Sequence, residues 1–463
     1  MTEDTDRFVQ LCKKFATIDL LADGPPSPPW YSSPTQQAVK VAIETSALGL
    51  PQSYQSDYVT KLLSTDSFRN VLSLPPDQLE TITGAVYQHD PVLGVLPQLQ
   101  RFLAVISYFY HSFIAEIQGS QLSIAMASTL PPLALFQHSA TNGPFTFTSD
   151  TMSELFGITI AVVSIPSAYR DHPVLWASLA HETGGHDVKH ASGALLTDLQ
   201  KAVRTLFSTD PLPSDFLNIT DDQIQGILWG SWIDEAAADV YGLLNMGPTF
   251  ALNLASYFAA LLYRLSAGTR PFPSLRTSTI APGNKLLDTH PTDILRLSLA
   301  IGVIENLRGL SQTTRDHYIT TLKQIAQFCA QGATTVAIRG FVPVSPDRPE
   351  IALHLDSRKA LEMMQDIAHR VGTHIATVQL PTLGDKSIQD IETWDDADEL
   401  VAQQIATAFQ NGASVVGMGN AAQLLAGATL ALFADAQKYT KVTEQLTEAL
   451  DFSYKHDFTW GMP

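Results

Sequence analysis

The chain has very few cysteines and few charged side chains. Cys12 and Cys329 are the only cysteines among 463 residues, which excludes the disulfide framework of many secreted domains and predicts a cytoplasmic location. Charged residues make up 16% of the chain and hydrophobic residues 45%, which excludes an intrinsically disordered chain. Because thiols are so scarce, a metal site has to be built from histidines and carboxylates.

Basic residues are also scarce. Lysine and arginine number 28 against 46 aspartates and glutamates, which gives a formal net charge of −18. A surface of this sign repels phosphate backbones and anionic lipid head groups, so neither nucleic acid nor membrane is an expected partner. The longest apolar stretches, 155–166 and 421–434, are shorter than the roughly 18 to 20 residues of a membrane-spanning helix. Residues 1–6 are acidic and lack the features of a signal peptide.

Hydrophobic periodicity predicts a mainly α (α+β) fold with a small β-sheet. We expect three regions: an N-terminal region at 1–34 with a helix (4–22) and a proline-rich connector (24–29), a catalytic region at 35–333, and a C-terminal α/β lobe or extension at 334–463. Strands are predicted at 157–165, 335–339 and 351–355. Further helices are predicted at 53–63, 76–87, 95–117, 173–190, 194–207, 231–244, 249–265, 292–307 and 313–331, and a final helical stretch from about 421 to 450.

One segment of the predicted 173–190 helix carries metal-ligand residue types. It is His181-Glu182-Thr183-Gly184-Gly185-His186. In the common zinc-peptidase motif two histidines four residues apart share a helical face, and the glutamate after the first one acts on water. Here the histidines are five residues apart, which in a regular α-helix separates them by about 140°. A π-bulge would restore a common face, and the two glycines would supply the backbone freedom for it.

A zinc site needs a third protein ligand, and the segment 232–239 offers one. Its alanines predict a helix, on which Glu235 and Asp239 share a face because they are four residues apart. Glu235 can bind the metal. Asp239 can accept a hydrogen bond from the far nitrogen of a ligating histidine and so fix its tautomer.

These two segments together resemble the gluzincin zinc metallopeptidases, in the lengthened His-Glu-x-x-Gly-His form found in the dipeptidyl peptidase III family. The resemblance covers about residues 173–245, and Asp234 stands where that family has a glutamate. It implies a zincin-like fold, one Zn²⁺ bound by His181, His186 and Glu235, and Glu182 as the general base. It also implies that Asp239 is the partner of a ligand.

A third segment, 288–296, contains Thr-His-Pro followed by an arginine and is similar to a segment found downstream of the metal motifs in several zinc-peptidase families. Pro291 suits the first turn of a helix, with the cap at Thr289 or His290. His290, Arg296 and Tyr241 are, in that order, candidates to stabilise an oxyanion, and His290 or Arg296 could hold a substrate carboxylate. The alternative interpretation is a helix start with a surface arginine.

The predicted reaction is hydrolysis of a peptide or amide bond by a zinc-activated water, with Glu182 moving the proton. The substrate is a peptide or a small molecule. The strand 157–165 would border the cleft and, if it has an open edge, pair with an extended peptide; the alternative is a core strand.

Three alternatives stay open. His186 and His190 have the regular four-residue spacing and form a rival metal pair, although no glutamate follows His186. The same ligands would serve a zinc lyase or isomerase acting on a small metabolite, or a non-catalytic zinc-binding protein. The sequence contains no signal for the oligomeric state.

Overall fold

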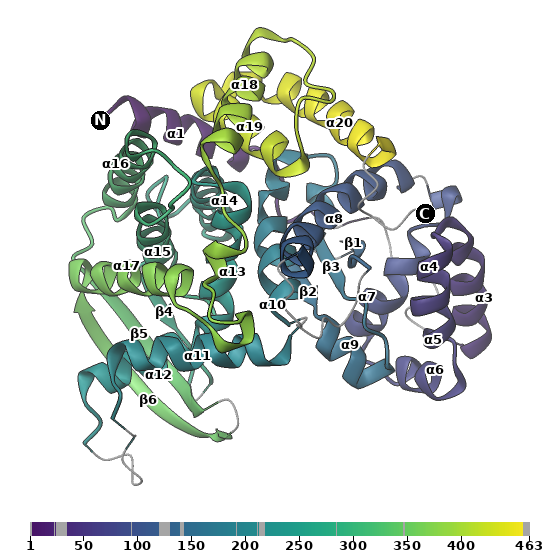
Figure 1. Ribbon diagram of the computed structural model, residues 1–463, viewed down its shortest axis with the longest axis horizontal. Coiled ribbons are helices and arrows are strands. Elements are labelled where there is room, and N and C mark those ends of the chain that lie inside the picture. The colour runs from purple at the N-terminus through teal and green to yellow at the C-terminus, as the bar shows by residue number, and fades with distance from the viewer. Residues whose placement is uncertain are drawn as a thin grey trace. The chain divides into compact units, whose positions relative to one another are not determined.

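The computed structural model describes residues 2–22, 24, 35–93, 95–119, 130–138, 143–190, 192–210, 212, 218–283, 285–345 and 348–456. Helices account for 66% and strands for 10%, and the strands form two separate three-stranded sheets (Figure 1). The predicted mainly helical fold with little sheet is therefore confirmed. None of the helices within these ranges is long and apolar enough to cross a membrane. The predicted proline connector lies outside the described residues, apart from Gly24.

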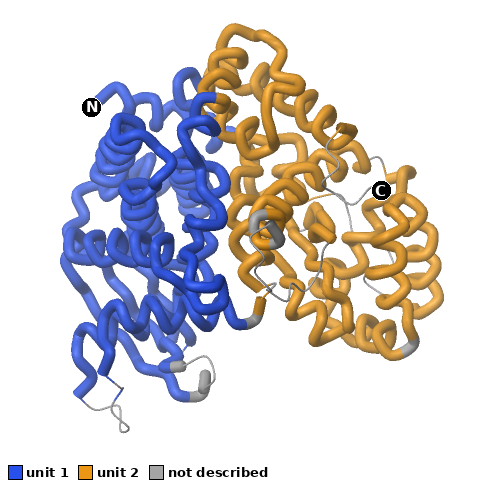
Figure 2. Tube along the Cα trace, viewed as in Figure 1, with its two compact units in different colours: residues 1–17, 194–400, 433–436 blue, residues 18–193, 401–432, 437–463 orange. Residues whose placement is uncertain are grey.

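The chain forms two compact units, each assembled from separate segments of the sequence (Figure 2). Unit 1 comprises residues 1–17, 194–400 and 433–436, and unit 2 comprises residues 18–193, 401–432 and 437–463. Each unit contains one of the two sheets.

Unit 1 is a set of helices with one sheet, in the order β4-β5-β6. β4 (Ser278–Ile280) runs parallel to β5 (Thr335–Ser345), and β6 (Arg348–Ala360) runs antiparallel to β5. Its helices are α1 (Glu3–Ala16), α11 (Gly193–Phe207), α12 (Asp221–Ser231), α13 (Ile233–Met246), α14 (Thr249–Leu265), α15 (Asp293–Glu305), α16 (Gln312–Cys329) and α17 (Leu361–Thr377), with short 3₁₀ turns at Pro381–Leu383 and Ile388–Asp390. Both α12 and α17 contact β5, and α15 packs on α13, α16 and α17.

Unit 2 has a sheet in the order β1-β3-β2. β3 (Val162–Pro166) pairs parallel with β1 (Leu133–Gln137) and antiparallel with β2 (Phe145–Phe147). Its longer helices are α3 (Gln36–Ser46), α6 (Thr65–Leu72), α7 (Pro76–Tyr87), α8 (Leu96–Gly119), α9 (Ser149–Phe156), most of α18 (Asp396–Asn411), most of α19 (Ala421–Ala434) and α20 (Tyr439–His456). Its short pieces are α4 (Gln52–Tyr54), α5 (Thr60–Leu62), α10 (Val188–His190), π-helices η2 (Gln55–Val59) and η6 (Ala180–Asp187), and 3₁₀ turns η1 (Ala47–Gly49), η3 (Pro91–Leu93), η4 (Ser167–Tyr169), η5 (Pro173–Ala177) and η9 (Ala436–Lys438). A core of buried aliphatic and aromatic side chains from α3, α7, α9, β1 and β3 fills the unit.

The strand predicted at 157–165 needs two corrections. It begins only at Val162, because Gly157 has φ +65° and caps α9 instead of starting a strand. It is also the central strand of its sheet, paired on both sides, and all its residues are buried. A strand with both backbone edges already paired has no free edge, so the expected pairing of this strand with an extended substrate is wrong.

Most predicted helices form close to the expected bounds, whereas their type and grouping differ in places. The helix expected at 173–190 is three short pieces, η5, η6 and α10. The helix expected at 231–244 is α13, and α12 precedes it. Within 334–393 the two expected strands are longer, and α17, which was not predicted, follows them.

His89 is a buried histidine of unit 2 that must be neutral in the folded protein. Its Nδ1 lies 2.9 Å from the carbonyl oxygen of Ala85, and burial lowers its pKa from 6.5 to about 4. His89 therefore binds a proton more tightly in the unfolded chain than in the folded protein. The stability due to a neutral His89 is complete above pH 6.5 and is lost as the pH falls toward 4, by up to about 3 kcal/mol.

We expect His89→Gln, which keeps a donor but does not titrate, to flatten the fall in unfolding free energy between pH 6.5 and 4. Chemical denaturation at several pH values measures this slope. An equal slope in the variant and the parent protein would contradict the assignment of a neutral, proton-excluding His89.

Candidate metal centre

The two histidines of the lengthened motif share one face of the π-helix η6. The π-helix bonds each residue to the one five positions away, so residues five apart are stacked. The Nε2 atoms of His181 and His186 are 3.2 Å apart, and their rings stand edge to face with centroids 4.8 Å apart. Two nitrogens bound to one tetrahedral zinc at 2.0–2.1 Å would be about 3.3 Å apart. The predicted widened turn is confirmed, and its ring spacing fits two ligands of one ion.

The widened turn forms without left-handed backbone. Gly184 and Gly185 both lie inside η6, and neither has a positive φ. Both are buried. Neither glycine therefore adopts the αL conformation that glycine allows. Their contribution to η6 is that they have no side chain.

Glu182 is held by the edge strand β2. The hydroxyl of Thr146 lies 2.9 Å from Glu182 Oε2 and 3.0 Å from the backbone carbonyl oxygen of the same residue, so it can donate to either. Glu182 is buried, with 5% of its surface exposed. A buried carboxylate with one oxygen bonded has a fixed orientation, which suits a residue that must receive a proton from one direction. The sequence contained no signal for Thr146, because the short strand β2 was not predicted.

The helix α13 in unit 1 carries the predicted carboxylate ligand. Glu235 is buried, and its Oε2 lies 3.2 Å from Nε2 of His290. The other ring nitrogen of His290 lies 2.8 Å from Oδ1 of Asp288. His290 is therefore held between two carboxylates, which brings two of the predicted site residues together.

A tryptophan at the start of α13 fixes the segment that carries His290. Nε1 of Trp232 donates to the carbonyl oxygen of Asp288 at 2.9 Å, and Trp232 packs edge to face on Trp229, both fully buried. Burial would raise the pKa of Asp288, but hydrogen bonds from His290 and the charge of Arg276 lower it to about 2. The ionised carboxylate keeps His290 oriented. Asp288 was missed as a site residue, although its place two residues before His290 was a signal.

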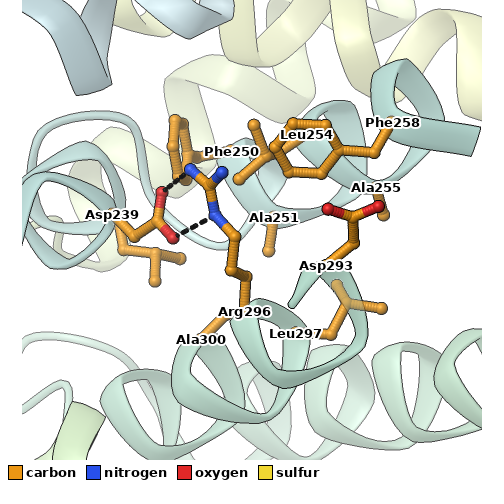
Figure 3. A pocket seen from close by; sticks show the side chains of 11 residues that line it. Asp239, Phe250, Ala251, Leu254, Ala255, Phe258, Asp293, Arg296, Leu297 and Ala300 are labelled. Atoms are coloured by element: carbon orange, nitrogen blue, oxygen red, sulfur yellow. Dashed lines mark hydrogen bonds and ion pairs between the residues drawn. The ribbon is translucent and has the colours of Figure 1, made fainter. Parts of the chain in front are cut away.

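Asp239 and Arg296 form a buried ion pair with two hydrogen bonds (Figure 3). Nε and Nη2 of Arg296 each lie 2.6 Å from a different oxygen of Asp239, and both side chains are at least 95% buried. Burial alone lowers the pKa of Arg296, but Asp239 outweighs it and the pKa is raised. The guanidinium also lies over the ring of Phe258, 4.6 Å from its centroid.

Arg296 is buried, so the alternative interpretation of a surface arginine is wrong. The expected helix start at Pro291 is also wrong: α15 begins at Asp293, with Thr292 at its N-cap. Since both oxygens of Asp239 accept from Arg296, any bond from Asp239 to a ligating histidine has to share an oxygen; that role remains a prediction.

Tyr241, the last predicted oxyanion donor, lies on α13 and is fully buried. Burial is the main cause of a raised pKa for its phenol, which stays protonated and able to donate.

The rival histidine His190 lies in unit 2, where its Nδ1 is 2.8 Å from Oδ2 of Asp150. Asp187, beside His186, is buried, which raises its pKa to about 7.

A scan of the chain against models of protein families finds no match, and searches of curated proteins and of solved structures find none either. The function of this chain is therefore inferred from the residues described above.

We expect Arg296→Met to lower the free energy of unfolding by about 3–5 kcal/mol, because it leaves the Asp239 charge buried without its partner. The double variant Arg296→Met with Asp239→Leu removes both charges and should recover much of that loss. Denaturant unfolding of the two variants measures the difference. A single variant as stable as the parent protein would show that the pair is not buried as described.

Proposed function

We propose that this chain is a zinc-dependent hydrolase that cleaves a peptide or amide bond, with a zincin-like arrangement in which His181, His186 and Glu235 bind the metal. The observation that carries the proposal is the 3.2 Å separation of the two histidine Nε2 atoms on a π-helix. The resemblance to gluzincin motifs over about residues 173–245 supports the same ligands and the same metal.

The donor set suits zinc and leaves a position for chemistry. Two imidazoles and one carboxylate are three of the four ligands of a catalytic zinc site, whose fourth position takes water or substrate. When bound, zinc supplies a Lewis acid that polarises the carbonyl of the substrate and lowers the pKa of water to about 7. Glu235 is the proposed third ligand, and its contact with His290 keeps its carboxylate oriented.

Glu182 is the proposed general base. Its carboxylate, oriented by Thr146, takes the proton from the attacking water and later gives it to the leaving nitrogen. Because Glu182 is buried, it acts largely outside bulk solvent, where proton transfer to a positioned acceptor is favoured.

His290 is the first choice as the donor that stabilises the oxyanion, since Asp288 holds its Nδ1 and its side chain is 43% exposed. Its Nε2, which meets Glu235 here, would donate to the oxyanion once Glu235 binds the metal. Arg296 is buried and uses two of its five N–H groups to bind Asp239, so we assign it a positioning role in unit 1 instead of a contact with substrate. Tyr241, predicted third, becomes the second candidate donor.

We expect the purified protein to bind one zinc per chain and Glu235→Gln to weaken zinc by more than the roughly 10- to 100-fold that loss of an outer partner costs. Zinc competition with a chromophoric chelator measures this. The exposed Glu444→Gln is the matched control and should bind zinc like the parent protein. No stoichiometric zinc in the parent protein would overturn the site, and unchanged affinity in Glu235→Gln would overturn that ligand.

We expect Glu182→Gln to retain zinc and to lower kcat on a peptide library by about 10²–10⁴-fold, because the amide cannot accept the proton. Mass spectrometry of the digested library reports the rate. A library left intact by the zinc-loaded parent protein, together with a product from a metabolite screen that depends on Glu182, would exclude a peptidase and favour a lyase or isomerase.

We expect Thr146→Val to lower kcat about tenfold without changing zinc affinity or KM, because it removes the hydrogen bond that orients Glu182. The same library assay gives kcat and KM. Thr60→Val, which removes a hydroxyl bonded to a helix carbonyl of unit 2, is the control and should leave kcat unchanged. A parent-like kcat for Thr146→Val would contradict the orienting role.

A further inference from the structure

Unit 1 contains a groove that none of the proposed zinc chemistry uses. It has a volume of about 650 Å³ and is lined by one stripe from each of three helices and by the turn after α16. The lining residues are Ser298, Ile301 and Glu305 of α15, Lys323, Ala326, Gln327 and Ala330 at α16, residues 332–334, and Leu361, Gln365, Asp366 and His369 of α17. Spacings of three and four residues place each stripe on one helical face. The volume lies in the range of small-molecule sites.

Part of the groove lining is apolar and buried. Ile301, Ala326, Ala330 and Leu361 are buried, and Gly332 and Ala333 continue the row of small residues at the turn. Small side chains leave the space that forms the groove. An apolar group of a few carbons can therefore be buried there.

The groove also has charges of both signs that do not neutralise each other. Lys323 and Asp366 both line it, and neither has a hydrogen-bond or ion-pair partner within the part of the chain that the structure describes. Glu305 and His369 differ, because Nε2 of His369 lies 2.7 Å from Oε2 of Glu305. One cationic and one anionic side chain are thus free to meet a ligand that carries both charges.

Ser298 adds a hydroxyl to the same groove. It lines the groove, and its side chain has no hydrogen-bond partner among the described residues. Its oxygen can therefore bond a polar atom of a ligand.

The groove is held open by a rigid crossing of two of its helices. A Cβ on Gly302 would lie 2.1 Å from the carbonyl oxygen of His369, and a Cβ on Gly372 would lie 2.2 Å from that of Leu299. The backbones of α15 and α17 are therefore in direct contact. Thr373 of α17 also donates to the carbonyl oxygen of Gly302 at 3.0 Å. A groove fixed in this way needs little ordering when a ligand binds.

We propose that this groove is a second binding site, for a small zwitterion of the amino-acid class with an apolar side chain. Lys323 binds the carboxylate and Asp366 the ammonium group, while Ser298 bonds a polar atom of the ligand. The apolar side chain lies against Ile301 and Leu361. The site is independent of the zinc ligands and stands whether or not the protein is a hydrolase.

The test is calorimetric titration of the full chain with L-leucine, with 4-methylpentanoate, which lacks the ammonium group, and with isopentylamine, which lacks the carboxylate. We expect L-leucine to bind and each single-charge analogue to bind at least about tenfold more weakly, because each loses one charged contact. Lys323→Gln and Asp366→Asn should each weaken L-leucine by a similar factor, and Ala333→Leu, which fills the groove, should abolish binding.

Two control variants show whether L-leucine binds in this groove or elsewhere on the chain. Lys61→Gln and Glu444→Gln remove an exposed lysine and an exposed glutamate of unit 2, and both should leave L-leucine binding unchanged. Thermal unfolding of each variant shows that it is folded. No binding of L-leucine at about 10 mM, far above the concentration at which a specific site should fill, equal binding of the single-charge analogues, or binding that survives Ala333→Leu would each overturn the proposal.

Discussion

The hydrogen-bond register of one short π-helix underlies the proposed chemistry. Within η6 each backbone bond spans five residues instead of four, and this alone brings His181 and His186 onto a common face. In a regular α-helix the same sequence would direct the two rings apart. The rest of unit 2 supports that register: α8 and β2 pack on η6, and β2 supplies Thr146 to Glu182.

Several charged side chains of unit 1 are buried. Asp239 is neutralised by Arg296 with two hydrogen bonds, and Asp288 is held ionised by His290 and Arg276. Asp239 is buried and needs its partner, whereas Asp288 is 43% exposed and its donors fix its orientation. The result is a fixed set of side chains around Glu235 instead of a mobile acidic surface. The same unit carries the groove at α15, where Lys323 and Asp366 lack such partners among the described residues.

Local sequence patterns were sufficient to predict most of the helices. They failed for strands, whose formation depends on pairing with residues far away in the sequence. The helices at 76–87 and 249–265 have the predicted bounds, because apolar periodicity is a local signal and a proline stands at or just before the start of each helix. β2 was missed, since three residues gain their strand conformation only from β3. The position of β3 inside its sheet also depends on β1, which lies about 30 residues earlier.

Three features of the candidate site could be predicted from the chain alone: the histidines and glutamate of the lengthened motif, the need for a widened turn, and the pair Glu235 and Asp239 on one helix. Those are consequences of residue type and spacing. The contacts between side chains could be seen only in the folded units. Arg296 binds Asp239, His290 contacts Glu235, and Thr146 contacts Glu182. These partners lie 57, 55 and 36 residues apart in the sequence, so they meet only when each unit folds.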